Sequence, residues 1–295
     1  FCSCGAGPEV KIVVTGGAGF IGSHIVALLV AEGHKVQILD CIHPQVHPGG
    51  KVPGYLSKKA EFVCGDIRNR KLMEALLART DVVFHEASLV GVGQSMYEIE
   101  EYVDINTRGT ALLLELLTTQ KHKIKKLIVA SSMSIYGEGA YRCVTCGSAT
   151  PDERAAEDLK KGRYDPTCKR HRRPLRFAPT PETRPRVPTS IYAITKRDQE
   201  EMCLMIGKAY GIPTVALRYF NVYGPRQSLS NPYTGVLAIF GSRLLNGHAP
   251  LIFEDGLQSR DFVHVRDIAA ANLAALESSR ADGEVINIGT GRPRT

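Results

Sequence analysis

The sequence KIVVTGGAGFIG at residues 11–22 joins a run typical of a buried strand to a glycine-rich turn and the start of a helix. Gly16, Gly19 and Gly22 have the spacing G-x-x-G-x-x-G, with Phe20 and Ile21 between the last two. Small residues let the backbone approach a pyrophosphate, and a helix N-terminus offers that anion unpaired N–H groups and a partial positive charge. The stretch predicts a dinucleotide-binding turn, with an ordinary structural turn as the alternative.

Residues at the ends of the next strands extend this site. Asp40 ends the second predicted strand, where a carboxylate can bind the adenosine ribose diol and would repel a 2′-phosphate, so the sequence favours NAD over NADP. Asp66 and Ile67 follow the third strand, and Asp66 could accept a hydrogen bond from the adenine amino group. Ala87 follows the fourth strand and keeps the wall beside the cofactor thin. Asp66 and Ala87 could equally be turn or packing residues.

Strand and helix patterns alternate along most of the chain. We expect further strands at 35–40, 61–64, 81–85, 126–130, 214–220 and 284–288, and helices at 20–32, 97–119, 189–210, 235–245 and 265–277. Such alternation favours βαβ units and a parallel sheet covered on both faces. The predicted fold class is α/β, a Rossmann-type doubly wound parallel sheet with a smaller α/β substrate-binding lobe and an inserted Cys-rich module. Such sheets bind ligands at the carboxyl ends of their strands.

A tyrosine, a lysine and a serine are candidates for chemistry at that edge. Tyr192 and Lys196 are four residues apart in a predicted helix, which places the phenol and the ammonium on one face. Because the ordinary tyrosine pKa is about 10, a phenolate needs the Lys196 charge and a cationic nicotinamide ring to form at neutral pH. Ser131 and Ser132 end a predicted strand, where a hydroxyl could bridge a sugar oxygen and Tyr192.

Six motifs then identify a family. They are TGGAGFIGSH at 15–24, NTRGT at 106–110, SSMSIYGEG at 131–139, YAITK at 192–196, LRYFNVYGPRQ at 217–227 and SRDFVHVRD at 259–267. On these motifs the chain resembles the extended short-chain dehydrogenase/reductases, specifically the NAD-dependent epimerase/dehydratase family. The resemblance covers almost the whole chain. It implies an enzyme that holds NAD tightly and acts on a nucleotide-diphosphate sugar.

The resemblance also implies roles for individual residues. Ser132, Tyr192 and Lys196 are the implied catalytic residues; Tyr192 and Lys196 also contact the cofactor, and Ser132 also contacts the substrate. Asn106 is implied at the cofactor site, where it supports the catalytic helix. The implied diphosphate-binding residues are Asn221 and Arg260, with Arg226 as a further candidate for the same anion.

Departures from related subfamilies narrow the expected reaction. Related 4,6-dehydratases carry two acids directly after the catalytic Ser or Thr, and related decarboxylases keep a Glu at the second of these positions. Met133 and Ser134 stand there in this chain, which disfavours elimination and decarboxylation. Oxidation and re-reduction at one carbon remain. Glu86 and Ser88 replace the usual Leu and Ala beside the cofactor, and we expect the chemistry to be unaffected.

The expected function is therefore a nucleotide-sugar 4-epimerase, an isomerase. Tyr192 would take the C4 hydroxyl proton while the hydride passes to NAD, and both would return to the other face of the rotated ketosugar. The phrases SSMSIYGEGAYRC and NPYTGVLAIF resemble epimerases of the dTDP-L-rhamnose 4-epimerase type, with UDP-glucose/UDP-galactose 4-epimerases as the alternative. No residue decides thymine against uracil. A nucleotide-sugar reductase or dehydrogenase, and a catalytically silent NAD-sensing or nucleic-acid-binding protein, are further alternatives.

Two short motifs within 141–186 predict a metal site. Cys143 and Cys146 form a C-x-x-C pair, Cys168 and His171 form a C-x-x-H pair, and 21 residues separate the two pairs. These four ligands could close a tetrahedral zinc site and so order a segment that is too polar to fold alone. The alternative is two chance pairs whose thiols stay reduced.

These patterns divide the chain into four expected segments. They are a NAD-binding Rossmann domain at 8–140, the inserted basic Cys/His module at 141–186, a return to the sheet with the catalytic helix at 187–220, and a mainly substrate-binding lobe at 221–295 from which one strand returns to the sheet. We expect both ends to be clipped. Related proteins form homodimers through a four-helix bundle, for which the candidate helices here are 97–119 and 189–210.

The net charge is concentrated in the inserted module. The whole chain has 37 Lys+Arg and 30 Asp+Glu, and residues 141–186 hold 12 of the former and 6 of the latter, which leaves 25 against 24 elsewhere. A solvated face of the module explains this excess better than a nucleic-acid partner does. The longest apolar run, Ile25–Ala31, is too short to span a membrane, and no leader precedes the first strand. We therefore expect a cytoplasmic protein without membrane or nucleic-acid partners.

Overall fold

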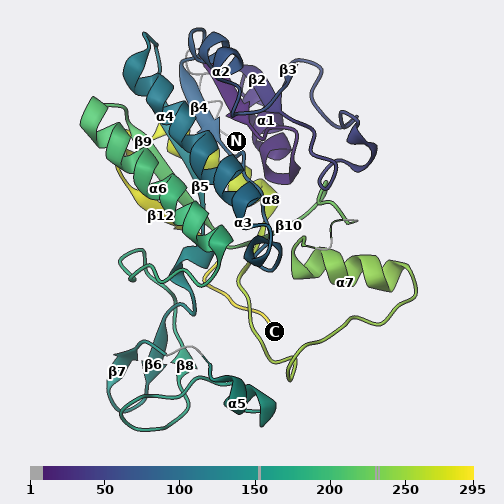
Figure 1. The fold of residues 1–295 in the computed structure, drawn as a ribbon, viewed down its shortest axis with the longest axis vertical. Coiled ribbons are helices and arrows are strands. Elements are labelled where there is room, and N and C mark those ends of the chain that lie inside the picture. Colours follow the sequence, from purple (N-terminus) through teal and green to yellow (C-terminus); the bar gives the residue numbers. More distant parts are fainter. Residues whose placement is uncertain (1–8, 152–153, 230, 232) are drawn as a thin grey trace, which may run out of the picture.

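The fold is built on a seven-stranded parallel sheet, shown in Figure 1. The computed structural model describes residues 9–151, 154–229, 231 and 233–295, so the predicted segment boundary at 8 lies outside the described residues. In the order β12-β9-β5-β4-β1-β2-β3, the strands are Val285–Ile288, Thr214–Tyr219, Lys126–Ser132, Val82–His85, Lys11–Thr15, Lys35–Asp40 and Glu61–Cys64. This topology confirms the predicted α/β, Rossmann-type class.

Helices cover both faces of the sheet because side chains alternate along each strand. On β4, Phe84 packs with α1 (Phe20–Ala31) and α8 (Val265–Glu277), while Val83 packs on the opposite face. That opposite face is covered by α2 (Arg70–Leu77), α4 (Gly109–Thr119) and α6 (Ile191–Tyr210), of which α4 and α6 lie side by side (Figure 1). The carboxyl ends of the parallel strands form one edge of the sheet, between these two layers of helices.

The predicted helix 97–119 is interrupted in the structure. It begins as α3 (Ile99–Tyr102), continues as a π-helical stretch over Val103–Arg108, and ends as α4. The π-helical stretch turns Asn106 inward, where the side chain is completely buried. Such a local change of helical period often occurs at functional sites. The helix α2, which the sequence patterns left out, starts where the Asn69 side chain accepts a hydrogen bond from the Leu72 N–H.

Residues 141–186 contain more regular structure than their sequence indicates. The strands β6 (Tyr141–Cys143), β7 (Gly147–Ala149) and β8 (Arg176–Phe177) form a small antiparallel sheet in the order β7-β6-β8, accompanied by α5 (Ala156–Lys160). Figure 1 shows this small sheet beyond one end of the main sheet, far from α2 and β3. Among its described residues, the buried apolar cluster consists of Cys143, Cys168 and Leu175, with Tyr141 and Ala149 against it.

The last part of the chain adds a second small sheet beside the main one. It pairs β10 (Asn221–Tyr223) in parallel with β11 (Phe262–His264), and α7 (Val236–Leu245) lies between them in sequence. Across 9–151, 154–229, 231 and 233–295, the structure has no helix of the length and apolarity that a membrane crossing requires.

Candidate active site

A cavity of about 490 Å³ opens at the carboxyl ends of the central strands. It brings together most of the residues singled out from the sequence. These are Gly16, Gly19, Phe20, Ile21, Gly22, Asp40, Asp66, Ile67, Ala87, Ser132, Tyr192, Lys196 and Asn221. The turn residues and the candidate catalytic residues therefore share one cavity, although Gly16 and Lys196 are 180 positions apart in the chain.

The glycine turn leaves no room for side chains. Gly16 has a φ of +69°, and a Cβ there would lie 2.9 Å from backbone atoms of Ala87. A Cβ on Gly22 would lie 2.3 Å from the carbonyl oxygen of Gly16. Gly19 is the N-cap of α1 and has no side chain to cap the helix, so the first N–H groups of α1 stay available for an anion at the cavity. This cradle fits the pyrophosphate of a dinucleotide.

Two acids hold the loops at the adenosine end of this cradle. Asp40 accepts hydrogen bonds from the backbone N–H groups of Ala18 at 3.0 Å and Ile42 at 2.9 Å. Each carboxylate oxygen keeps further acceptor capacity, which a ribose diol can use. Asp66 accepts from the Arg68 guanidinium and backbone N–H, and these bonds lower the pKa of Asp66. Asp66 therefore stabilises its own turn while it lines the cavity.

The start of α6 places Tyr192 against Ser132. Ser190 caps the helix by accepting a hydrogen bond from the Ala193 N–H at 3.1 Å, and Ser95 Oγ accepts from the Tyr192 N–H at 3.0 Å. Ser132 hydrogen-bonds the Tyr192 hydroxyl, while its neighbour Ser131 points away from the cavity because strand side chains alternate. Ser131 also borders the cavity, but its hydroxyl donates to Glu200 Oε2 at 2.6 Å, so Ser132 is the serine of this pair whose hydroxyl faces Tyr192.

Lys196 lies one turn further along α6 and is buried. Its Nζ donates to the carbonyl oxygen of Ala130 at 2.8 Å and to Oε1 of Gln199 at 2.9 Å. Burial lowers the pKa of Lys196 to about 8, although the charge of Glu86 acts in the opposite direction. Burial also raises the pKa of Tyr192 to about 12, against the smaller effect of its hydrogen bond from Ser132. Burial is thus the largest effect on the pKa of both groups within the protein, and the expectation for the phenolate named the Lys196 charge together with a cationic nicotinamide ring.

The sequence patterns missed the residues that hold Lys196 in place. Gln199 Nε2 donates to Thr110 Oγ1 at 2.8 Å, and the same hydroxyl lies 2.8 Å from His85 Nε2. Burial lowers the pKa of His85 to about 3, so the ring is neutral and can both donate and accept. Thr15 Oγ1 completes this buried chain at 2.8 Å from His85 Nδ1. The available signal was the position of Gln199, three residues after Lys196 and therefore on the same helix face.

Three predicted residues do not line the cavity. Asn106 is saturated by protein partners: its Nδ2 donates to the Leu89 carbonyl and to Thr195 Oγ1, so it supports α6 as expected but does not face the cofactor site. Arg226 donates to the Ser23 carbonyl at 2.9 Å. The Arg260 guanidinium donates to the Ser259 carbonyl at 2.9 Å. Neither arginine is among the residues that line the cavity, whereas Asn221 is.

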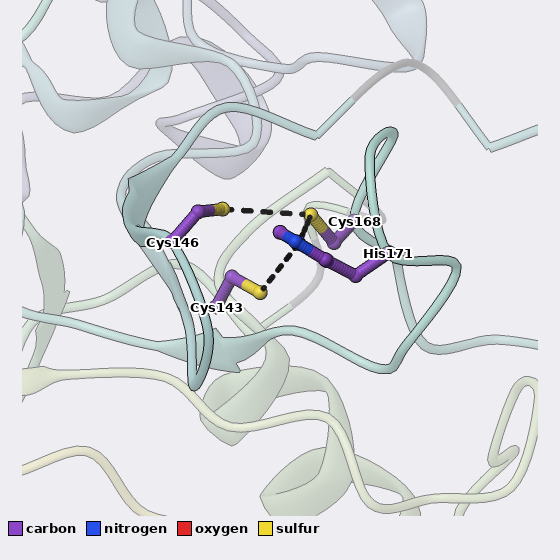
Figure 2. Close-up of side chains that lie close together, drawn as sticks. All are labelled: Cys143, Cys146, Cys168 and His171. Carbon is purple, nitrogen blue, oxygen red and sulfur yellow. Dashed lines mark hydrogen bonds between the residues drawn. The ribbon is translucent and has the colours of Figure 1, made fainter.

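The four predicted metal ligands converge in the small sheet module, as Figure 2 shows. Their ligand atoms all lie within 4.8 Å of one another, and the cysteines are free thiols. Cys168 Sγ lies 3.7 Å from Cys146 Sγ, and His171 Nδ1 lies 3.5 Å from Cys168 Sγ and 3.7 Å from Cys143 Sγ. A tetrahedral zinc with bonds of about 2.3 Å to sulfur and about 2.0 Å to nitrogen separates its ligand atoms by about 3.5–3.8 Å. The cluster fits that geometry.

Comparison with known proteins places this architecture in a family. The chain is 34% identical over 286 residues to the dTDP-L-rhamnose 4-epimerase of Burkholderia thailandensis, covering 96% of this chain and 77% of that protein. It is 37% identical over 283 residues to a putative UDP-glucose 4-epimerase of Methanocaldococcus jannaschii, covering 95% and 77%. The UDP-glucuronic acid 4-epimerase of Bacillus cereus, solved with UDP-glucuronic acid and NAD, superposes with a TM-score of 0.75 at 31% identity, covering 96% and 79%.

Residues 12–167 and 168–289 match the NAD dependent epimerase/dehydratase family. The match includes the glycine turn, the Tyr192/Lys196 helix and both strands of the second small sheet. With the shared cavity and these relatives, it shows that the chain belongs to the NAD-dependent epimerase/dehydratase family.

Proposed function

We propose that this chain is an NAD-dependent nucleotide-sugar 4-epimerase that inverts C4 of a dTDP- or UDP-hexose through a 4-keto intermediate. The observation that carries the proposal is the single cavity that holds both the glycine turn with Asp40 and the Ser132, Tyr192 and Lys196 set. Met133 and Ser134 also line this cavity, so the positions after Ser132 supply no carboxyl group for elimination. The similarity to 4-epimerases supports the same reaction.

The glycine turn and Asp40 are the residues of this proposal that hold the cofactor. Gly16, Gly19 and Gly22 take the pyrophosphate at the start of α1, and Asp40 takes the adenosine ribose. When bound, NAD supplies a reversible hydride acceptor at its nicotinamide ring. Ala87 is packed against Gly16, so the wall beside the turn is thin.

The protein's own part of the reaction is proton transfer and positioning. Tyr192 takes the proton of the sugar C4 hydroxyl and later returns it, and Ser132 hydrogen-bonds both Tyr192 and the sugar oxygen. Lys196, held by Ala130 and Gln199, keeps a positive charge in the cavity that favours the phenolate over the neutral phenol. Asn221 is the substrate-binding residue at the cavity.

The proposal is tested with purified protein and a panel of dTDP- and UDP-hexoses, without added cofactor. We expect conversion of dTDP-L-rhamnose or a close relative to its C4 epimer, because of the likeness to that type of enzyme; conversion of UDP-glucose instead would select the alternative substrate. Tyr192→Phe should lower kcat by about 10²–10⁴-fold. Tyr210→Phe, at the exposed end of the same helix, is the control. Steady production or consumption of NADH, or full activity in Tyr192→Phe, would contradict the proposal.

We also propose that Cys143, Cys146, Cys168 and His171 bind a structural zinc. The ligand spacing supports it, and so does the small apolar cluster of the module, which offers little burial to hold three short strands together. Purified protein should contain about one zinc per chain, and Cys168→Ser should remove most of it. Cys64→Ser, on an exposed cysteine of the main sheet, should leave the zinc content unchanged. Protein without zinc, or zinc retained by Cys168→Ser, would reject the site.

We further propose a homodimer through α3, α4 and α6. Exposed apolar side chains lie on these neighbouring helices and on the π-helical stretch that joins α3 to α4; they are Ile99, Val103 and Met205. A partner that covers them would remove this apolar surface from water. Met205→Glu should shift the protein to monomer in light scattering, whereas Leu245→Glu on α7 should not. A wild-type monomer, or a dimer that tolerates Met205→Glu, would contradict this arrangement.

A further inference from the structure

A partly buried carboxyl group stands at the reacting end of the cavity. Glu86 directly follows β4 and lines the cavity with Tyr192 and Lys196. Its Oε1 accepts a hydrogen bond from the hydroxyl of Tyr219 at 2.9 Å. Asn272 of α8, itself completely buried, donates to the same hydroxyl at 2.8 Å, so β9 and α8 together hold the carboxyl group in place.

Glu86 differs from the other acids that line the cavity. Asp40 is bound by backbone N–H groups, and Asp66 by the Arg68 guanidinium. For Glu86, the described part of the chain provides one neutral donor, the Tyr219 hydroxyl, and no hydrogen bond from a cation or a backbone N–H. The nearby cation Lys196 donates hydrogen bonds to the Ala130 carbonyl and to Gln199 Oε1. A carboxylate held here is available to another positive group in the cavity.

We propose that Glu86 is the counter-charge of the oxidised nicotinamide and makes this chain bind NAD⁺ in preference to NADH. The proposal rests on the NAD site proposed above. The oxidised ring is cationic and the reduced ring is neutral, so a carboxylate in a cavity of low dielectric stabilises the oxidised form selectively. The leucine usual in the family at this position carries no charge. The expectation that Glu86 leaves the chemistry unaffected is thereby revised: Glu86 favours return of the hydride to the sugar.

The ionisation of Glu86 gives the proposal a pH signature. Burial raises the pKa of Glu86 to about 7, against opposing effects of Tyr219 and Lys196. The other titratable groups around it are Tyr192, with a pKa of about 12, and His85, with a pKa of about 3, so neither changes charge near neutrality. Lys196 titrates at about 8. The ratio of bound NAD⁺ to bound NADH should therefore rise with pH through about 7. The part of this rise that is due to Glu86 is the part that Glu86→Gln lacks.

The experiment measures cofactor preference without any sugar. Purified protein is equilibrated with an equal mixture of NAD⁺ and NADH, freed of unbound nucleotide and denatured, and the released nucleotides are quantified. At a pH of about 8, Glu86→Gln should lower the ratio of bound NAD⁺ to NADH by about tenfold or more. Its ratio should also change little between about pH 6 and about pH 7.5, where the wild-type ratio rises. Tyr219→Phe keeps the carboxylate and should stay within about threefold of wild type.

Three outcomes of the nucleotide measurement would overturn the proposed role of Glu86. A wild-type ratio that does not rise with pH overturns it, even if no variant is folded. Equal ratios in wild type and Glu86→Gln overturn it, as does a Tyr219→Phe ratio as low as that of Glu86→Gln, which would show a packing effect. The nucleotide-binding assay contains no sugar, so it tests the role of Glu86 independently of the proposed reaction. A protein that does not epimerise any sugar in the substrate panel would reject the proposed reaction, and the nucleotide ratios would still test Glu86.

Discussion

Removing the charge of Glu200 should destabilise this protein strongly. Glu200 lies on α6 and is completely buried. Its carboxylate accepts hydrogen bonds from Ser131 Oγ at 2.6 Å and from the Arg218 guanidinium at 2.8 Å and 2.5 Å. The side chain of Arg218 is 3% exposed, so Glu200→Gln would leave its guanidinium almost dry and without a full counter-charge.

The size of the effect follows from this burial. Breaking a buried ion pair by removing one partner costs about 3–5 kcal/mol of the free energy of unfolding. An unfolding entropy of about 2.1 cal/mol/K per residue gives about 0.6 kcal/mol/K for 295 residues, so Tm should fall by about 5–8 °C. The double variant Glu200→Gln/Arg218→Met should be more stable than the two single effects combined, because it leaves no unpaired buried charge.

The assay is urea and thermal unfolding of the two single variants and the double variant. Asp158→Asn is the matched control, since it breaks an ion pair with Arg163 whose side chains are 47% and 62% exposed, and should cost less than about 1 kcal/mol. The reasoning is refuted if Glu200→Gln is no more destabilising than Asp158→Asn. It is also refuted if the two single effects simply add in the double variant.

Two further predictions concern the glycine turn and the buried histidine. Gly22→Ala should abolish retention of NAD, because the added Cβ would lie 2.3 Å from the Gly16 carbonyl oxygen. Gly54→Ala is the control and should retain NAD, since a Cβ at Gly54 meets no atom within 4 Å. Equal nucleotide content in the two purified variants would contradict this prediction. His85 binds fewer protons folded than unfolded between its ordinary pKa of 6.5 and about 3, so wild-type stability should fall with falling pH in that window, by up to about 1.4 kcal/mol per pH unit from this group. His85→Gln should lose less stability over the same window in urea unfolding, and parallel pH dependences in both proteins would rule this out.

The parts of the site that the sequence predicted lie within short continuous segments of the chain. The glycine spacing at 16–22 and the strand-end position of Asp40 need only a strand, a turn and a helix in sequence order. The four-residue spacing of Tyr192 and Lys196 likewise follows from one helix. Because parallel strands end at one edge, their meeting in one cavity was also foreseeable.

Other features depended on contacts between distant segments. The π-helical stretch around Asn106 matters because its side chain reaches Leu89 and Thr195, and no local pattern marks that change of helical period. The positions of Arg226 and Arg260 depend on how the loops beside β10 and β11 lie against the sheet. Motif similarity predicted both arginines at the substrate, and in the structure their guanidinium groups donate to the Ser23 and Ser259 carbonyls.

The sequence by itself determined the parallel α/β fold, the glycine-rich turn and the candidate reacting residues, since these depend on local periodicity and on residue chemistry. Only the tertiary structure decided which groups lose contact with water. Burial raises the pKa of Tyr192 and lowers that of Lys196, and it places the carboxyl of Glu86 beside them. Desolvation is a property of everything packed around a side chain, so a single residue that looked like a minor departure in the sequence becomes a charge that can set the cofactor's preferred state.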